Sequence, residues 1–506
     1  MKLNFLKSTA IILCSAALFT TACRRDKVNQ PAEVTVAGPN INIFGITRSN
    51  ELVAFNASTP GTSSKNAITG LVAGETLMSI DYRPSTGELY ALSSASKLYI
   101  INTTTFAAHV VNATPFTPAI SGTVFSIDFN PTVDRLRLVS NNGQNLRLNP
   151  ETGIVAATDM AINGGASPAI SGIAYTNSRA GAATTMFLAL DQVTAKLYEV
   201  NPPNNGTLVE KGNLGIAFTG QIAFDISPDN SAALVAAKVN SVNTLYLLDI
   251  ASGKATKIAN TREELIDIAI PTEPVAYSVD AANNLLIYNP ETTSPSVTSK
   301  PITGLQAAET IQGIDFRPLN GQLYALGSTS RLYTINAASG AAAQVGTAIF
   351  STLLNGTDFG FDFNPTVDRI RVVSNLGQSM VLNPTDGTVA SVSPGINPGL
   401  PMVTSAAYSN NFAGATTTVF YVLDHNADRL YTQSPATSTI TDIGPLGVNI
   451  DAANGFDIGS TTGKAYLATT VGGVNRIYSV NLSNGATTSM GMLTTAVKGF
   501  TIGTGF

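Results

Sequence analysis

Two copies of one polar phrase contain the residues best suited to bind a charged ligand or a sugar. Residues 128–144 read DFNPTVDRLRLVSNNGQ, and residues 362–378 read DFNPTVDRIRVVSNLGQ. Two arginines that are two residues apart on a strand share a face, and with nearby amides they could hold a carboxylate, a phosphate or sugar hydroxyls through forked hydrogen bonds. The candidate residues are Asp134, Arg135, Arg137, Asn141 and Gln144, repeated as Asp368, Arg369, Arg371, Asn375 and Gln378.

The same ten residues also have a structural interpretation. Asp and Arg side chains can pair between neighbouring elements, and Asn side chains can cap turns. A duplicated unit can keep such a phrase either for folding or for binding. We favour the structural interpretation, in which the phrase staples neighbouring elements together, and ligand binding is the alternative.

A second set of candidate residues consists of aspartates in short apolar phrases such as SIDYRP and GIDFRP. Converging carboxylates could bind a cation, or two of them could act as the acid and base of a glycosidase. Near-identical carboxylates in successive units instead favour a structural role, in which each accepts backbone N–H groups at a turn. These aspartates are Asp81, Asp128, Asp225, Asp267, Asp315, Asp362 and Asp457.

Other chemistries find little support in the composition. The only histidines, His109 and His425, do not occupy corresponding positions in the two copies, and no GxSxG motif is present. A phosphate loop and a dinucleotide fingerprint are also missing, so we expect no cofactor and no bound metal. The net charge is −5 and only 12 % of residues are charged, which argues against a nucleic-acid partner.

The N-terminus predicts export. MKLNFLKSTAIILCSAALFTTAC has two lysines, an apolar run and a small-residue end at Cys23, the pattern of a secretory signal. Its end resembles the lipobox of bacterial lipoproteins, and that resemblance implies cleavage before Cys23 and lipidation of its thiol. We therefore expect a signal peptide at 1–22, a lipidated tether at 23–40 and a place in the bacterial cell envelope, on the periplasmic side or at the cell surface.

The chain is a repeat at two length scales. Asp134 and Asp368 are 234 residues apart, and this offset holds with small slips over most of the chain, which predicts two domains at 41–272 and 273–506. Within each domain a shorter phrase recurs every 42 to 51 residues. Its centres are Asp81, Asp128, Ala174, Asp225, Asp267, Asp315, Asp362, Ala407, Asp457 and Thr501. Ten strand-rich units of this length indicate an all-β fold, a β-propeller with four-stranded blades.

The spacing permits two arrangements of the ten blades. The body begins without the recurring phrase and ends on one, so a late strand can complete an early blade and leave no open edge. The same closure works within each half. We favour two tandem five-bladed rings because the duplication copies one complete domain, and one ten-bladed ring is the alternative.

Long phrases of the body resemble a bacterial family known as domain of unknown function 4394. They are GLVAGETLMSIDYRPSTGELYALSSASKLYIIN and SIDFNPTVDRLRLVSNNGQNLRLNPETG, together with their second copies. The resemblance covers nearly the whole body as two units. It implies an exported, propeller-like domain, and it transfers no catalytic residue.

These observations predict a lipid-anchored, exported β-propeller. We expect a non-catalytic binding or scaffold module for a protein or glycan partner, held to the membrane by its N-terminal lipid. The alternative is a carboxylate-dependent, glycan-active enzyme that uses the recurring aspartates.

Overall fold

The computed structural model describes residues 1, 34–165, 168–218 and 220–506. The predicted signal peptide after Met1, the lipidation site Cys23 and most of the predicted tether lie outside these residues. Thr35–Phe506 forms one compact unit of β-strands with a single 3₁₀-helix among its described residues, η1 (Pro203–Asn205). No helix in the described part of the chain combines the length and the apolar composition needed to cross a bilayer.

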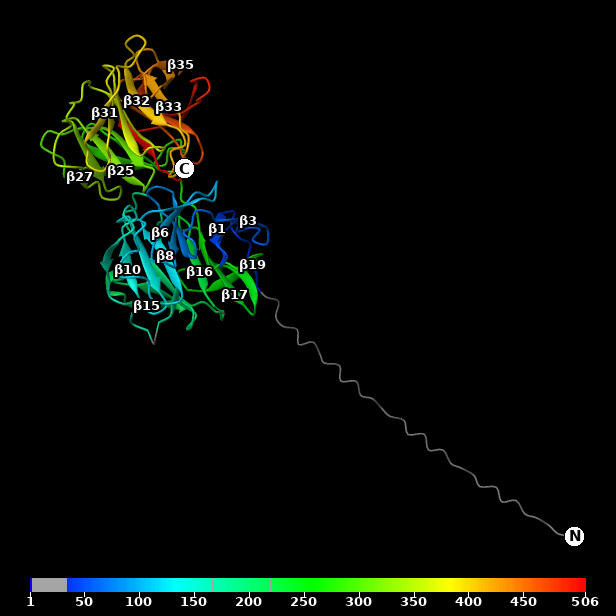
Figure 1. Cartoon of the computed structure of the whole chain (residues 1–506). Helices are drawn as coiled ribbons and strands as arrows, with labels where there is room; N and C mark the ends of the chain where they lie inside the picture. Colours follow the sequence, from blue (N-terminus) through cyan, green and yellow to red (C-terminus); the bar gives the residue numbers. More distant parts are fainter. Residues whose placement is uncertain (2–33, 166–167, 219) are drawn as a thin grey trace. The chain divides into compact units, whose positions relative to one another are not determined.

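The first half of this unit is a ring of five four-stranded antiparallel blades (Figure 1). The innermost strands contact each other in the cyclic order β4, β8, β12, β16, β20 and back to β4. The strands, blade by blade, are β20 (Asp267–Ala269), β1 (Asn42–Ile46), β2 (Glu51–Asn56), β3 (Ser63–Ala67); β4 (Leu77–Tyr82), β5 (Leu89–Ser93), β6 (Leu98–Ile101), β7 (Ala108–Val110); β8 (Phe125–Asn130), β9 (Arg135–Ser140), β10 (Asn145–Leu148), β11 (Val155–Thr158); β12 (Ile170–Tyr175), β13 (Phe187–Asp191), β14 (Lys196–Val200), β15 (Leu208–Asn213); β16 (Ile222–Ile226), β17 (Ala233–Val239), β18 (Val242–Leu248) and β19 (Ala255–Asn260).

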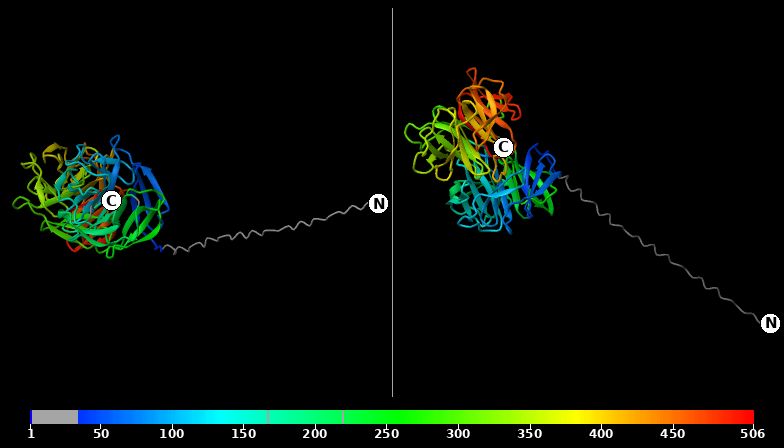
Figure 2. Two further views of the ribbon diagram at one scale, coloured as in Figure 1. Left: turned by 90° about the horizontal axis from the view of Figure 1, so that it is seen from below. Right: turned by 45° about the horizontal axis from the view of Figure 1, so that its top comes forward.

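The second half is another ring of five such blades, and its innermost strands follow the order β24, β28, β32, β36, β40 and back to β24. In Figure 1 and in the right-hand view of Figure 2, the strands of the two halves form separate groups. The strands are β40 (Lys498–Ile502), β21 (Ala276–Val279), β22 (Asn284–Tyr288), β23 (Thr298–Pro301); β24 (Ile311–Arg317), β25 (Gln322–Gly327), β26 (Arg331–Ile335), β27 (Ala342–Gln344); β28 (Phe359–Asn364), β29 (Arg369–Ser374), β30 (Ser379–Leu382), β31 (Val389–Val392); β32 (Val403–Tyr408), β33 (Phe420–Asp424), β34 (Arg429–Gln433), β35 (Ile440–Pro445); β36 (Asn454–Ile458), β37 (Ala465–Val471), β38 (Val474–Val480) and β39 (Thr487–Met492).

Each ring is closed by a strand from the far end of its own half. β20 pairs antiparallel with β1, with Gly45 opposite Ile268, and β40 pairs antiparallel with β21, with Tyr277 opposite Thr501. The prediction of two five-bladed rings is therefore confirmed, and the ten-bladed alternative is wrong. The reason is that the strand β20 returns to the start of the first half instead of continuing into the second.

Burial decreases along a blade from the ring axis outward. The innermost strand β8 is buried at nearly every position, although its sequence FSIDFN alternates apolar with polar residues. The outermost strand of the same blade, β11, alternates between half-buried and exposed residues. The inner strand touches neighbours on both faces, whereas the outer strand borders solvent, so in this blade burial alternates in the outer strand and not in the inner one.

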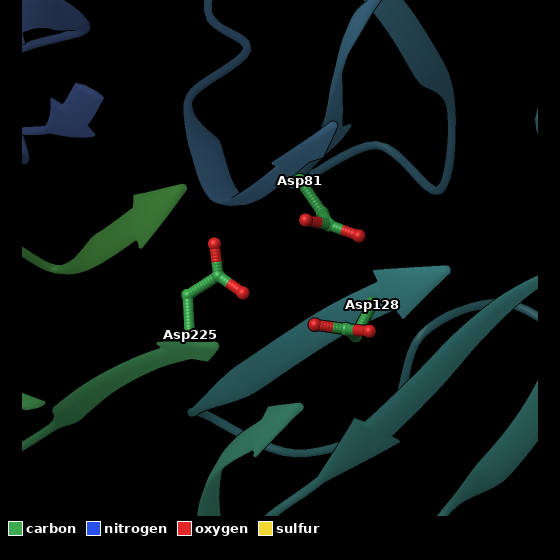
Figure 3. Close-up of side chains that lie close together, drawn as sticks. All are labelled: Asp81, Asp128 and Asp225. Atoms are coloured by element: carbon green, nitrogen blue, oxygen red, sulfur yellow. The ribbon is translucent and has the colours of Figure 1, made fainter. Parts of the chain in front are cut away.

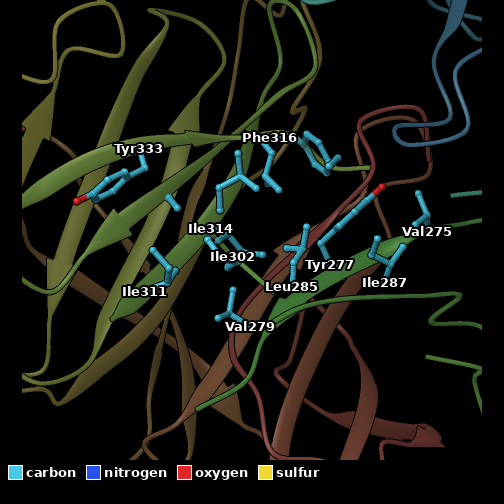
Figure 4. Packing of buried hydrophobic residues seen from close by; sticks show 14 residues of the cluster. Val275, Tyr277, Val279, Leu285, Ile287, Ile302, Ile311, Ile314, Phe316 and Tyr333 are labelled. Atoms are coloured by element: carbon cyan, nitrogen blue, oxygen red, sulfur yellow. The ribbon is translucent and has the colours of Figure 1, made fainter. Parts of the chain in front are cut away.

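The apolar core consists of separate clusters that fill the spaces between adjacent blades. Figure 4 shows one of them, where Tyr277 and Leu285 of one blade pack against Ile314 and Phe316 of the next. The rings of Tyr277 and Phe316 meet edge to face with centroids 5.2 Å apart. Tyr90 and Phe129 in the first ring, and Tyr324 and Phe363 in the second, also meet edge to face between neighbouring blades.

Glycines let the inner strands approach each other at the axis of the second ring. A Cβ atom on Gly455 of β36 would lie 2.5 Å from the backbone nitrogen of Phe500 in β40. Because backbone cannot move aside as a flexible side chain can, only glycine fits at this position. The axis is therefore tightly packed, and the inner side chains close to it are brought together.

Candidate functional site

The aspartates of the inner strands converge on the axis of each ring. In the first ring, carboxylate oxygens of Asp81 (β4), Asp128 (β8) and Asp225 (β16) all lie within 4.8 Å of one another (Figure 3). The second ring repeats the arrangement with its own three aspartates, namely Asp315, Asp362 and Asp457. Residues at equivalent positions of radially arranged strands point to one centre, and the propeller therefore gathers groups that are far apart in sequence.

Each axial carboxylate accepts a backbone N–H from the inner strand of the next blade. The Phe129 amide donates to Asp81 Oδ2 at 2.7 Å, and the Tyr175 amide donates to Asp128 Oδ1 at 3.0 Å. In the second ring the amide of Tyr408 donates to Asp362 Oδ1 at 2.9 Å. Backbone acceptance was predicted, but at turns; the bonded amides lie in neighbouring inner strands instead, because the axis leaves those strands no other partner on that side.

Three of the ten inner strands lack an acidic residue at this position: two carry alanine and one carries threonine. Ala174 and Ala407 occupy the fourth blade of each ring, and Thr501 stands where the first ring has Asp267. The Thr501 hydroxyl lies 3.0 Å from Asp315 Oδ1 and 3.0 Å from Asp457 Oδ2. Since a hydroxyl has one proton, both contacts are hydrogen bonds only when one of these carboxyls is itself protonated.

The electrostatics of the axis also favour protonated carboxyls. Burial raises the pKa of Asp225 to about 7 and the pKa of Asp267 to about 8. For Asp81, burial and the charge of Asp225 together place the pKa well above its usual range. In the second ring burial raises the pKa of Asp457 to about 7. These groups therefore share protons near neutral pH instead of carrying several full charges.

This geometry limits the chemistry of the axial carboxyls. Backbone amides already occupy lone pairs of these carboxyls, which leaves fewer of them for a cation that takes six to eight oxygen ligands. Asp128 is 2 % exposed and Asp362 is 1 % exposed. A polysaccharide chain cannot reach carboxyls at that depth, so the arrangement does not provide the cleft that a glycosidase pair requires.

The aspartates of the duplicated phrase link two blades. Asp134 accepts the Arg83 guanidinium, with Nε at 2.9 Å and Nη2 at 2.5 Å, and also the hydroxyl of Ser85 at 2.7 Å. In the second ring Asp368 accepts Arg317 in the same way, with Nε at 2.8 Å. Arg83 directly follows β4 and Arg317 is the last residue of β24, each the inner strand of the preceding blade. These pairs therefore join adjacent blades.

The arginines of the phrase point to different surroundings. Arg135 and Arg369 each donate Nη1 to the carbonyl oxygen of the preceding aspartate at 2.8 Å and remain partly exposed. Arg137 is 2 % exposed and donates Nη1 to Asp159 Oδ2 at 2.5 Å. Arg371 lies at the corresponding position of the second ring and is also buried.

The amides of the phrase hold the loop that enters the same blade. Asn141 Oδ1 accepts the Thr123 amide at 3.0 Å, and Gln144 Oε1 accepts the Ser121 amide at 2.8 Å. Asn375 and Gln378 make the same bonds in the second ring, with the amides of Thr357 and Asn355. The ten predicted residues therefore lie in three kinds of surroundings and do not form one continuous patch.

Sequence reasoning missed the partners of these side chains. Arg83 binds Asp134 and Glu151, and Asp159 binds Arg137 and Arg147. The pairs join blades or neighbouring strands, so the spacing of their members shows no periodicity. Aligning the two copies could have drawn attention to these acidic partners. The alignment pairs Asp159 with Ser393 and Glu151 with Thr385, so the second copy lacks both carboxylates.

Comparison with solved structures finds chains of low similarity. One is the extracellular domain of a hybrid two-component system from B. thetaiotaomicron, at 11 % identity and a TM-score of 0.26, covering 91 % of this chain and 66 % of that one. Another is PorZ, a surface component of the type-IX secretion system of Porphyromonas gingivalis, at 12 % identity and a TM-score of 0.26, covering 90 % of this chain and 60 % of that one. No match was found among curated proteins.

The family assignment comes from the sequence model of a single domain. The model described as Domain of unknown function (DUF4394) matches twice, at residues 51–269 and 284–501. Each match lies within one five-bladed ring and extends into its closing strand, β20 or β40. The chain therefore belongs to the DUF4394 family and contains two copies of its domain.

Proposed function

We propose that the protein is an exported, lipid-anchored module that binds a protein or glycan partner without catalysing a reaction. The inner carboxyls and the buried residues of the duplicated phrase hold the blades and the entering loops. The surface of the loops then remains for a partner. The predicted leader and Cys23 supply export and anchoring in this proposal.

The observation that carries the proposal is a set of exposed apolar side chains on loops of the second ring. Leu353 is 57 % exposed, Leu376 is 61 % exposed and Leu400 is 95 % exposed. The loops lie at one end of a single blade, because Gln378 Nε2 donates to the Leu353 carbonyl and the Ile396 amide donates to the Gly377 carbonyl. The first ring has Ala119 and Asn142 where the second has Leu353 and Leu376, so this surface is not needed to build a ring.

A thermal-shift screen tests binding by this surface. Residues 35–506 would be screened against peptidoglycan fragments, plant and host polysaccharides, and peptides. The double variant Leu353→Ala/Leu376→Asn restores the residues of the first ring and should fold normally. We expect a ligand that raises the Tm of the wild type by several degrees and leaves the double variant unchanged.

The matched control is Val209→Asn, which removes an apolar side chain of similar exposure, 49 %, from the first ring. It should respond to the ligand as the wild type does. A panel without any ligand, or a ligand that stabilises the double variant equally, would contradict the proposed binding surface.

The anchor is tested separately by Cys23→Ser in the full chain expressed in a bacterium. We expect the wild type in the membrane fraction with incorporated labelled palmitate, and the variant without label and released from the membrane. A wild type that incorporates no label, or a variant that stays in the membrane fraction, would contradict lipid anchoring at this cysteine.

A further inference from the structure

The second ring contains a buried arginine with no acidic partner. Arg371 of β29 is 7 % exposed, and its guanidinium forms no ion pair with any carboxylate in the described part of the chain. Its partners are neutral: Ser393 Oγ at 2.8 Å, Ser379 Oγ at 3.2 Å and the Pro435 carbonyl at 3.1 Å. Its Nε has no hydrogen-bond partner. Burying a charge without a counter-charge costs folding free energy, so an anion beside this guanidinium would be stabilising.

The first ring shows which group belongs there. Arg137, the counterpart of Arg371, donates to Asp159 Oδ2 at 2.5 Å, and Arg147 holds the same carboxylate through Nε and Nη2, each at 2.9 Å. Arg137 also donates Nε to the Tyr175 hydroxyl at 3.1 Å and Nη1 to Asn145 Oδ1 at 2.8 Å. The carboxylate of the chain itself therefore neutralises the buried guanidinium in this ring.

The second ring keeps the backbone of that site and loses the carboxylate. Arg137 pairs with Arg147 across β9 and β10, and Arg371 pairs with Val381 across β29 and β30. In the second ring the backbone amide of Ser393 donates to the backbone carbonyl of Ser379 at 2.8 Å. In the first ring the backbone amide of Asp159 donates in the same way to the carbonyl of Asn145 at 3.0 Å.

These correspondences identify the residues that changed. Ser393 replaces Asp159, Ser379 replaces Asn145 and Val381 replaces Arg147. All three replacements are smaller and uncharged, so the second ring keeps the guanidinium but has no carboxylate beside it.

Other buried polar groups at the same junction of blades are also unsatisfied. Gln433 is 3 % exposed, and neither its amide oxygen nor its nitrogen has a partner. It ends β34, two residues before Pro435, whose carbonyl Arg371 contacts. Its counterpart is Val200, which packs in the apolar cluster of the first ring with Tyr175. The hydroxyl of Ser438 is likewise buried without a partner. Such groups are normally satisfied, and these two lie within three residues of Pro435, whose carbonyl Arg371 contacts.

We propose that Arg371 binds the carboxylate of a small ligand at the place that the carboxylate of Asp159 fills in the first ring. Ser379 and Ser393 line the site. Ser393 is only half-buried and Pro435 is exposed, which gives a ligand access from the surface. In the first ring the carboxylate at this place contacts Nη1 of Arg137, and Nη1 of Arg371 contacts the hydroxyls of Ser379 and Ser393, which can donate to the oxygens of a carboxylate. This proposal does not depend on the function proposed above.

Acetate is the probe for the test. The Tm of residues 35–506 would be measured in sodium acetate and in sodium chloride of equal ionic strength at pH 7. We expect acetate at 100 mM to raise the Tm by at least about 2 °C over chloride. Saturation transfer from the protein to the acetate methyl group would report binding directly.

Ser393→Asp supplies the missing carboxylate from the chain itself and should abolish both signals. Ser391→Asp, at an exposed position of β31 two residues earlier, makes the same charge change and should keep them. Asp159→Ser should create the site in the first ring and roughly double the acetate response. If Ser393→Asp does not fold, Arg371→Met replaces it as the variant expected to lose the signals.

The proposal is overturned if the wild type responds equally to acetate and chloride. It is also overturned if Ser393→Asp retains the saturation transfer of the wild type. Equal stabilisation by sulfate and acetate would contradict the assignment to a carboxylate.

Discussion

Replacing Arg83 with methionine is expected to destabilise the first ring by about 4 kcal/mol. Arg83 is 1 % exposed and forms ion pairs with Asp134 and Glu151, which are 2 % and 8 % exposed. It also donates Nη1 to the Gly321 carbonyl at 3.0 Å. Methionine keeps most of the side-chain volume but removes the positive charge, so two buried carboxylates remain without compensation. Removing one partner of a buried pair costs about 3–5 kcal/mol.

The pKa shifts of Asp134 and Glu151 show how strongly these carboxyls depend on Arg83. Burial alone would raise the pKa of Asp134, yet the charge of Arg83 holds it below the usual range. The carboxyl of Glu151 has a raised pKa because burial outweighs the same attraction. Without Arg83 both carboxyls are expected to take up protons, and the variant should lose less stability at pH 5 than at pH 8.

The second ring offers the matched control, Arg317→Met. Arg317 and its partner Asp368 have side chains 13 % and 31 % exposed, and Thr385 replaces Glu151. Water screens this pair, and we expect its loss to cost about 1 kcal/mol. The chain has no tryptophan, so a tryptophan at Val209 or at Val392, both exposed, reports urea unfolding of the first or the second ring alone. Equal costs for the two variants would show that burial of the ion pair does not decide its strength.

The blades could be predicted from the sequence because each inner strand carries a recognisable phrase. β24 reads IQGIDFR and is buried at six of its seven positions, and related phrases, most of them with an aspartate at the place of Asp315, recur in the other inner strands. The number of rings could not be derived with the same certainty. Whether β20 returns to β1 depends on a pairing between strands about 220 residues apart, and the spacing of the phrases is the same for either closure.

The candidate sites show the same limit. The sequence places Arg137 on a strand, but its surroundings come from Tyr175 in the next blade and from Asp159 beyond β11. Contacts across the junction between blades leave no short-range pattern. The duplication offsets part of this limit, because the replacement of Asp159 by Ser393 can be read from the aligned copies. Its effect on Arg371 can be inferred only from the structure, in which both rings share one backbone arrangement.

The first ring should lose stability as the pH rises from about 4 to about 8. Its axial carboxyls have a higher pKa in the folded ring than in the unfolded chain, so the folded ring binds more protons between these pH values. A raised carboxyl pKa contributes stability at low pH, and the contribution is lost as the pH rises through the folded value. For Asp267, with a pKa of about 8, the loss between pH 5 and pH 9 is on the order of 4 kcal/mol, at about 1.4 kcal/mol per unit.

Asp267→Asn should flatten this pH dependence. The amide is neutral at every pH and its oxygen can still accept the Ile80 amide, which now donates to Asp267 Oδ2 at 3.0 Å. It cannot replace the second acceptor, Oδ1, which takes the Ile268 amide at 3.0 Å, so the variant should be about 1 kcal/mol less stable than the wild type at pH 5. At pH 9 the order should reverse, because the wild type must then ionise a buried carboxyl.

The measurement is urea unfolding of the first ring at pH 5, 7 and 9, followed through the tryptophan at position 209. Asp451→Asn is the control, since it removes an exposed carboxyl and should leave the slope of the wild type unchanged. The second ring provides an internal comparison, because Thr501 takes the place of Asp267 there and one titrating group is missing. A wild-type first ring whose stability is constant or rises from pH 5 to pH 9, or an Asp267→Asn variant with the wild-type slope, would show that the axial carboxyls are ionised in the folded protein.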